Sequence, residues 1–265
     1  MTVSTAIILA AGRGMRLGDD WRDRPKGFIP CQGTTLVERS LLILRSCGID
    51  RVVIVTGHCS AFYETLAAAS GGFVTTLFNE RYADNGSLVS LTVALAAVQA
   101  PCLILDSDIV YQRRGLVALL ACPMENAALV SGTTSSGDEY YAWADVVPGS
   151  PLPLVRRLSK HLSEESDAPI GEHVGILKIG PRLAGLVRGA AAAKVAAQPM
   201  AFYEDCLIEQ LPACPMGAVR IDDLVWCEID DPRMLQRAED IVFPHLDPLE
   251  VIEREAEALA SVAGA

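Results

Sequence analysis

Short apolar runs alternate with helix-like segments over residues 5–110, and this alternation limits the fold more than any other feature of the chain. The apolar runs are TAIILAAG, RVVIVTG, FVTTLFN and PCLILDSD. The segments between them space their apolar residues as helices do: TTLVERSLLILRSCG, SAFYETLAAAS and SLVSLTVALAAVQ. Strands that are apolar almost throughout are buried on both faces, and strands that alternate with helices pair in parallel. We therefore predict a doubly wound, Rossmann-like α/β unit with a mixed, mostly parallel sheet.

The pattern changes after Asp108. AALVSGT, YYAWADVV, LVRRLSK and HVGILKIG are short strand-like runs between polar or Pro/Gly-rich turns. They predict antiparallel strands that form a small lid or extend the sheet. MAFYEDCLIEQL is predicted as a helix and LVWCEID as a strand. DPRMLQRAEDIV is predicted as a helix that Asp231 caps, with Pro232 in its first turn.

These elements are expected to form one domain over residues 1–243. Within it we expect a core at about 5–110 and a lid region at about 127–200. Residues 244–265 are predicted to form an acidic amphipathic helical tail. Such a tail more often packs against a domain than carries a function, and it is also compatible with a homodimer arm.

Composition excludes several classes of partner. The chain has 265 residues and a net charge of −11, which argues against binding to nucleic acid or an anionic membrane. Its eight cysteines form no CxxC pair, and several lie in apolar runs, as small hydrophobic side chains do in a reducing compartment. No stretch approaches the ~20 apolar residues of a membrane span, and the first residues lack the features of a secretion signal. We expect a cytoplasmic protein.

The segment LAAGRGMRLG (Leu9–Gly18) follows the first apolar run and has the composition of a phosphate-binding loop. Its glycines are spaced GxGxxxG, and the next strand ends in VTG, so the GxGxxG spacing and the ribose-binding acidic residue of a dinucleotide site are both missing. The Walker pattern GxxxxGK[ST] is absent too. Glycines still let the backbone approach a triphosphate, and Arg16 and Lys26 would place positive charge on the phosphates that leave as pyrophosphate.

Two predicted strand ends carry carboxylates. LILDSDIVY places Asp106 and Asp108 two residues apart, so both point to the same side. VWCEIDDP places Glu228, Asp230 and Asp231 at another strand end. Carboxyl ends of parallel strands border the crevice where α/β sheets bind ligands, and Mg²⁺ prefers a few oxygen ligands together with substrate phosphates. We predict that Asp108 and Asp230 hold Mg²⁺; the alternative is a helix cap and solvated surface carboxylates.

The order LAAGxGxR, PK and LVER resembles the nucleotidyltransferases that join a nucleoside triphosphate to a sugar phosphate or a phosphoalcohol. Arg16 and Lys26 fall on the charged positions of that signature. Further segments resemble bacterial phosphocholine cytidylyltransferases, namely LFNERYADNGSLVSL, LDSDIVY, FYEDCLIEQL and VWCEIDDPRMLQRAEDI. The similarity runs from Ile7 to about Ile241. It implies a fold of the nucleotide-diphospho-sugar transferase type, CTP as a substrate and Mg²⁺ as the cofactor.

The resemblance also implies which residues meet the substrates. Arg16 and Lys26 would be catalytic, and Asp108 and Asp230 would hold the metal. The predicted nucleotide-binding residues are Leu9, Ala10, Ala11, Gly12, Arg13, Gly14, Met15, Asn79, Ser87, Ser90 and Asp106. The predicted acceptor-binding residues are Tyr82, Tyr140, His173, Lys178, Glu204 and Asp205.

The segments that would enclose choline depart from the resembled family. A quaternary ammonium is bound by aromatic faces, and the choline enzymes place aromatic residues in two segments where this chain has Asn85, Leu88, Val89 and Glu204. Glu204 and Asp205 would suit a primary ammonium, as in 2-aminoethylphosphonate. His173 and Lys178 would suit an acceptor anion, or else serve the structure alone. Hydroxyalkyl and carboxyl phosphonates stay open as acceptors.

The sequence thus favours a Mg²⁺-dependent cytidylyltransferase that transfers CMP from CTP to a small phosphoalcohol or phosphonate and releases pyrophosphate. One alternative is a sugar-1-phosphate nucleotidyltransferase that uses UTP, GTP or dTTP. Another is a nucleotide-binding module without catalysis, although the joint presence of Arg16, Lys26, Asp108 and Asp230 speaks against it.

Overall fold

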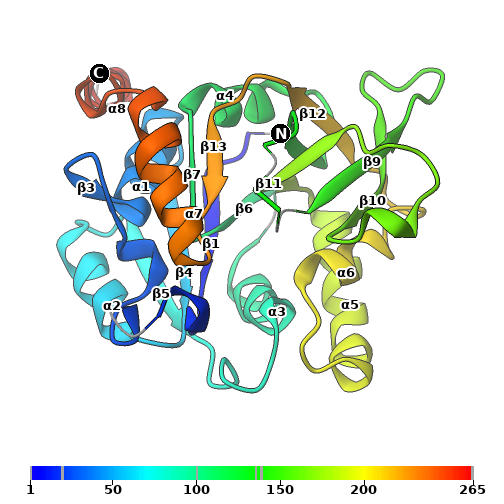
Figure 1. The fold of residues 1–265 in the computed structure, drawn as a ribbon, viewed down its shortest axis with the longest axis horizontal. Helices are drawn as coiled ribbons and strands as arrows, with labels where there is room; N and C mark the ends of the chain where they lie inside the picture. The colour runs from blue at the N-terminus through cyan, green and yellow to red at the C-terminus, as the bar shows by residue number, and fades with distance from the viewer. Residues whose placement is uncertain (1, 19–20, 100, 135, 138–139, 264–265) are drawn as a thin grey trace.

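A mixed sheet with helices packed on both faces forms the body of the molecule (Figure 1). It is seen in a computed structural model that describes residues 2–18, 21–99, 101–134, 136–137 and 140–263. The described strands of this sheet follow the order β5-β4-β1-β6-β11-β8-β12-β10-β9. In Figure 1 the amino-terminal part lies on the left, and the lid strands β9 and β10 lie on the right.

The amino-terminal part of the sheet is parallel, as predicted. It consists of β1 (Thr5–Ala10), β4 (Arg51–Thr56), β5 (Val74–Phe78) and β6 (Cys102–Asp106). In the central strand β1, Ile7 and Ile8 are almost completely buried against opposite helical layers. Burial on both faces explains why these strands read as continuous apolar runs.

The four later strand-like runs continue the same sheet. They form β8 (Ala127–Ser131), β9 (Tyr141–Asp145), β10 (Leu154–Ser159) and β11 (Gly171–Ile179), joined by β12 (Gly217–Ile221). Among the described strands, β11 and β10 run opposite to the rest. The predicted mixed, mostly parallel α/β sheet with antiparallel lid strands is therefore confirmed.

Helices cover the sheet in two groups. One face carries α3 (Ser87–Ala97), α5 (Pro181–Ala197) and α6 (Tyr203–Ile208). The other carries α1 (Leu36–Ser46), α2 (Ser60–Ala69), α4 (Arg113–Ala121) and the tail helix α8 (Leu249–Ala263). None of the helices in the described part of the chain has both the length and the apolar composition needed to span a membrane.

Local signals fixed several helix ends. Thr35 and Glu38 form the capping box at the start of α1, and Gly48 follows its end with a φ of +83°. The backbone N–H groups of Arg233 and Met234 donate to Asp231 at the start of α7 (Pro232–Arg237). The sequence interpretation assigned no helix to the segments of α4 and α5. The α5 segment is rich in alanine and has only a weak apolar stripe. The side of the helix that is buried is therefore set by its packing on the sheet and not by its sequence pattern.

A short ribbon stands apart from the main sheet. It pairs β7 (Ile109–Tyr111) with β13 (Trp226–Glu228) in antiparallel register. Apolar side chains beneath it join segments distant in sequence into one buried cluster, which contains Leu17, Ile29, Val110, Cys227 and Ile229. This cluster holds the glycine loop and the carboxyl end of β13 close to the end of β6.

Candidate active site

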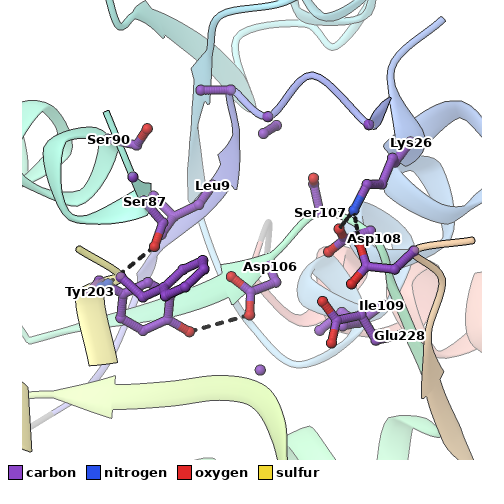
Figure 2. Close-up of a pocket in the computed structure, with 18 of the residues that line it drawn as sticks. Leu9, Lys26, Ser87, Ser90, Asp106, Ser107, Asp108, Ile109, Tyr203 and Glu228 are labelled. Carbon is purple, nitrogen blue, oxygen red and sulfur yellow. Dashed lines mark hydrogen bonds and ion pairs between the residues drawn. The ribbon is translucent and has the colours of Figure 1, made fainter. Parts of the chain in front are cut away.

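A cleft of about 510 Å³ opens at the carboxyl ends of β1 and β6. The glycine loop forms one wall, and residues of β11, the start of α6 and the end of β13 form others. This is where parallel α/β sheets bind their ligands. Figure 2 shows Asp106 between Tyr203 on one side and Lys26, Asp108 and Glu228 on the other.

The glycine loop leaves room for a ligand close to its backbone. A side chain at Gly12 would meet nothing within 4 Å. Gly14 has a φ of +61°, and a Cβ there would lie 3.2 Å from Cγ of Lys26. The left-handed backbone and this close approach both favour glycine, so the loop can run directly above the Lys26 side chain.

Lys26 joins the two predicted metal ligands. Its ammonium donates to Oδ2 of Asp108 at 2.6 Å and also to Oδ1 of Asp230. Arg16 donates to Oδ2 of Asp230 at 2.5 Å. Burial alone would lower the pKa of Lys26, but the two carboxylates raise it above its usual value. Burial would likewise raise the pKa of Asp230, yet Lys26 and Arg16 hold it below its usual value. The centre is therefore charged.

Glu228 completes a group of three carboxylates with Asp108 and Asp230. One oxygen from each lies within 4.8 Å of the others. The ribbon creates this group, since Glu228 pairs with Ile109 and the N–H of Ile229 donates to the carbonyl of Asp108 at 2.9 Å. Burial, followed by the charges of Asp108 and Asp230, raises the pKa of Glu228. Three carboxylates this close together repel one another, and a divalent cation that prefers oxygen ligands would relieve that repulsion.

The other end of the cleft is lined by Asp106, Tyr203 and Glu204. The Tyr203 hydroxyl donates to Oδ2 of Asp106 at 3.3 Å, and the Tyr203 N–H donates to Oγ of Ser87 at 3.1 Å. Burial raises the pKa of Asp106, and the nearby charge of Glu204 raises it further. Burial also raises the pKa of Glu204, to about 7. This end therefore concentrates carboxyl groups.

Gly175 on β11 makes room for Asp106, and replacing it should be costly. Gly175 has a φ of +76°, and a Cβ there would lie 2.7 Å from Oδ2 of Asp106. We expect Gly175→Ala to lower the free energy of unfolding by about 1–3 kcal/mol, measured by urea denaturation. Gly185→Ala in α5, where a Cβ meets nothing within 4 Å, is the control and should be stabilising by about 0.5–1 kcal/mol. Equal effects would contradict this assignment.

Most of the predicted site residues lie together in the cleft. Those that line it are Leu9, Ala10, Ala11, Gly12, Arg13, Gly14, Met15, Arg16, Lys26, Tyr82, Ser87, Ser90, Asp106, Asp108, Tyr140, His173, Glu204 and Asp230. Their individual roles stay predictions. Asn79, Lys178 and Asp205 are not among the lining residues.

Each of these three exceptions has a structural explanation. Asn79 is buried and donates to Oγ of Ser90 at 3.0 Å, so its side chain positions the lining residue Ser90. Lys178 pairs with Leu103 near the amino end of β6, whereas the cleft lies at the carboxyl end of that strand. The Lys178 ammonium donates to the carbonyl of Cys122 at 2.7 Å. Asp205 turns back to accept from the N–H of Phe202 at 3.1 Å as a helix cap.

His173 reaches the cleft, but as a neutral group. It is 3% exposed, and its Nδ1 lies 3.2 Å from the carbonyl oxygen of Leu129. Burial lowers the pKa of His173 to about 4, so the imidazole is uncharged at neutral pH. The neutral ring of His173 and the position of Lys178 both argue against the attraction of an acceptor anion, while the predicted acceptor-binding roles of the two residues stay predictions.

Several lining residues were not selected from the sequence. Lys160 follows β10, and its Nζ lies 5.4 Å from the centre of the Tyr140 ring. Glu228 had a sequence signal, because its spacing from Asp230 repeats the spacing of Asp106 and Asp108. Lys160 had none, because its place depends on how the lid strands pair.

Comparison with known proteins places the chain in a family. The model of the MobA-like NTP transferase domain matches residues 6–217. The chain belongs to this family. A choline-phosphate cytidylyltransferase of Haemophilus influenzae is 36% identical over 108 residues, which are 41% of this chain and 45% of that protein. A CMP-5'-(3-aminopropyl)phosphonate synthase of Streptomyces rubellomurinus is 26% identical over 94% of this chain and 40% of that protein. The chain thus spans less than half the length of these relatives.

Solved structures agree on the fold. An inositol-1-phosphate CTP transferase of T. maritima has a TM-score of 0.75 and 16% identity, covering 97% of each chain. A CTP:phosphocholine cytidylyltransferase of Streptococcus pneumoniae has a TM-score of 0.69 and 17% identity, covering 91% of this chain and 99% of that one. The predicted nucleotide-diphospho-sugar transferase type of fold is thereby confirmed.

Proposed function

We propose that this protein is a divalent-metal-dependent cytidylyltransferase, which transfers CMP from CTP to a small phosphorylated alcohol or phosphonate and releases pyrophosphate. The observation that carries the proposal is the convergence in one cleft of the glycine loop, Lys26, Arg16 and three carboxylates. The named activities of the cytidylyltransferase relatives support CTP as the nucleotide.

The chemistry follows from the charges of the reactants. A phosphate or phosphonate oxygen of the acceptor attacks the α-phosphorus of CTP, the bond to the β-phosphate oxygen breaks, and the electron pair leaves with pyrophosphate. The acceptor is already anionic, so no covalent enzyme intermediate is needed. Catalysis then depends on positioning the two anions and neutralising the charge that develops on the leaving group.

Residues of this chain can supply both effects. Glycine-loop N–H groups and Arg16 would hold the triphosphate, while Asp108, Glu228 and Asp230 would hold Mg²⁺. When bound, the metal would neutralise phosphate charge as a Lewis acid. Lys26 now neutralises Asp108 and Asp230 itself. A divalent cation held by those carboxylates would take over their neutralisation, and the Lys26 ammonium could then donate to the phosphates.

Pyrophosphate release tests the proposal directly. The full chain is incubated with Mg²⁺ and each of CTP, UTP, GTP and dTTP, together with phosphocholine, 2-aminoethylphosphonate, inositol-1-phosphate or glucose-1-phosphate. We expect release with CTP and a phosphoalcohol or phosphonate. Release only with UTP, GTP or dTTP and the sugar phosphate would instead identify the sugar-1-phosphate branch. No release with any pair would overturn the proposed transfer.

A further inference from the structure

A buried carboxylate oxygen at the acceptor end of the cleft has no hydrogen-bond partner among the described residues. It is Oε2 of Glu204, a residue that is 4% exposed at the start of α6 and lines the cleft. Leaving a buried carboxylate oxygen unpaired is costly, so the site is suited to a ligand that brings hydrogen-bond donors.

A second unsatisfied acceptor lines the same cleft. The Nδ1–H of His173 is directed at the Leu129 carbonyl, which leaves Nε2 with a lone pair. Nε2 is buried and has no partner in the described part of the chain. The backbone N–H of His173 donates to the carbonyl of Tyr140 at 2.7 Å, which ties β11 to the start of the lid at this residue. Both unsatisfied atoms accept hydrogen bonds, so both require N–H or O–H groups.

The charges here also favour a cationic ligand group. Asp106 and Glu204 lie at this end of the cleft, and Lys160 is also part of the described lining. Lys160 lies close enough to lower the pKa of both Glu204 and Glu228. A phosphorylated acceptor adds further negative charge, and a positive group at its other end would favour the ionised form of the buried Glu204 carboxyl.

The nearby aromatic rings are poorly placed to enclose a quaternary ammonium. The ammonium of Lys160 lies over the ring of Tyr140 at 5.4 Å from its centre. Phe202 packs edge-to-face against the same ring, with centroids 6.1 Å apart. Tyr203 is 1% exposed and its hydroxyl is engaged by Asp106. A cage of open aromatic faces is therefore not formed by these three rings.

From these observations we infer that the acceptor ends in an ammonium group that carries N–H bonds, received by the Glu204 carboxylate with His173 as a second hydrogen-bond acceptor. The inference rests on the proposed function and narrows its acceptor class. A trimethylammonium has no N–H to offer and leaves both buried acceptors unpaired. A neutral hydroxyl offers one donor but leaves the carboxylate charge uncompensated.

Acceptor selectivity should depend on pH. Glu204 receives an ammonium as a carboxylate and not as a neutral acid, and its pKa is raised to about 7 by burial. The charged and titratable groups around it are Asp205 and Tyr203 on its own helix, and Lys160, Tyr140 and Asp106 from other elements. We expect the ratio of kcat/KM for 2-aminoethylphosphonate to that for 2-hydroxyethylphosphonate to rise as pH increases through about 7. The hydroxyl compound controls for ionisation of the phosphonate.

The decisive experiment compares three acceptors that differ only at the distal group. Pyrophosphate release by the full chain with CTP and Mg²⁺ is measured with 2-aminoethylphosphonate, its N,N,N-trimethyl derivative and 2-hydroxyethylphosphonate. We expect kcat/KM to favour the amino compound over both others by ~10²-fold or more, because a site built for hydrogen bonds rejects analogues that lack them. Equal or better turnover of the trimethyl compound overturns the inference and leaves the proposed transfer intact.

Variants separate this role from a structural one. Glu204→Gln should lower kcat/KM for the amino compound by about 10–10²-fold, mainly through KM, and should change the hydroxyl compound by less than about threefold. Glu209→Gln on the exposed side, where Glu209 pairs with Lys194, should change neither. Equal losses on both acceptors with Glu204→Gln would overturn the inference.

Binding keeps the test decisive if no acceptor is turned over. In that case the proposed transfer fails, and calorimetry with Mg²⁺ and a non-hydrolysable CTP analogue decides the inference. Tighter binding of the amino compound than of the trimethyl compound supports it. Equal or weaker binding of the amino compound overturns it.

Discussion

Replacing Lys26 by Met should reduce pyrophosphate release on the order of 10²–10³-fold, the cost of removing one preorganised group that stabilises transition-state charge. The Lys26 ammonium contacts both Asp108 and Asp230. Cγ of Lys26 would lie 3.2 Å from a Cβ at Gly14, so the lysine side chain also packs against the glycine loop. It is thus placed between the predicted metal ligands and the predicted triphosphate. The loss should appear in kcat at saturating CTP and Mg²⁺.

The same variant should also alter stability in a metal-dependent way. Without Lys26, the carboxylates of Asp108 and Asp230 lose a partner that neutralises both. Lys26→Met should therefore melt at a lower temperature than the wild type without Mg²⁺, and should gain more on adding Mg²⁺. Lys194→Met, which removes a surface pair with Glu209, serves as the control. Unchanged kcat in Lys26→Met would refute the catalytic assignment.

Asp108→Asn should lower activity by a similar amount, on the order of 10²–10³-fold, through loss of the metal. Asp108 supplies one of the three carboxylates that come within 4.8 Å. An amide has no charge and is a weaker ligand for a hard cation, so more Mg²⁺ should be needed for half-maximal activity. Pyrophosphate release is measured over a range of Mg²⁺ concentrations, and Mn²⁺ binding to the protein is followed by electron paramagnetic resonance.

The exposed Asp50, which directly precedes β4 at the end of that strand opposite the cleft, provides a matched variant. Asp50→Asn should leave the Mg²⁺ dependence and the Mn²⁺ signal unchanged. An Asp108→Asn protein that keeps full turnover at wild-type Mg²⁺ concentrations would disprove the metal site. Comparison of Asp108→Asn with Lys26→Met distinguishes the charge that the metal supplies from the charge that the lysine ammonium supplies.

Local patterns were sufficient for much of the fold. The apolar runs of β1, β4 and β6 predicted a buried parallel sheet, because a strand covered on both faces needs apolar residues at every position. The starts of α1 and α7 were predicted from Thr35, Glu38 and Asp231, since capping bonds span only a few residues. The helix α5 was missed, because its alanines pack equally well on several sides.

The sequence by itself determined the residues whose chemistry follows from near neighbours: the glycine loop, Lys26 after it, and the carboxylates at the ends of β6 and β13. Only the tertiary structure decided which distant residues joined them. Strand register placed His173 beside the cleft and Lys178 at the other end of β11, away from the cleft. The pairing of β13 with β7 brought Glu228 to Asp108. Register and pairing depend on packing across the whole sheet, so a local pattern does not contain them.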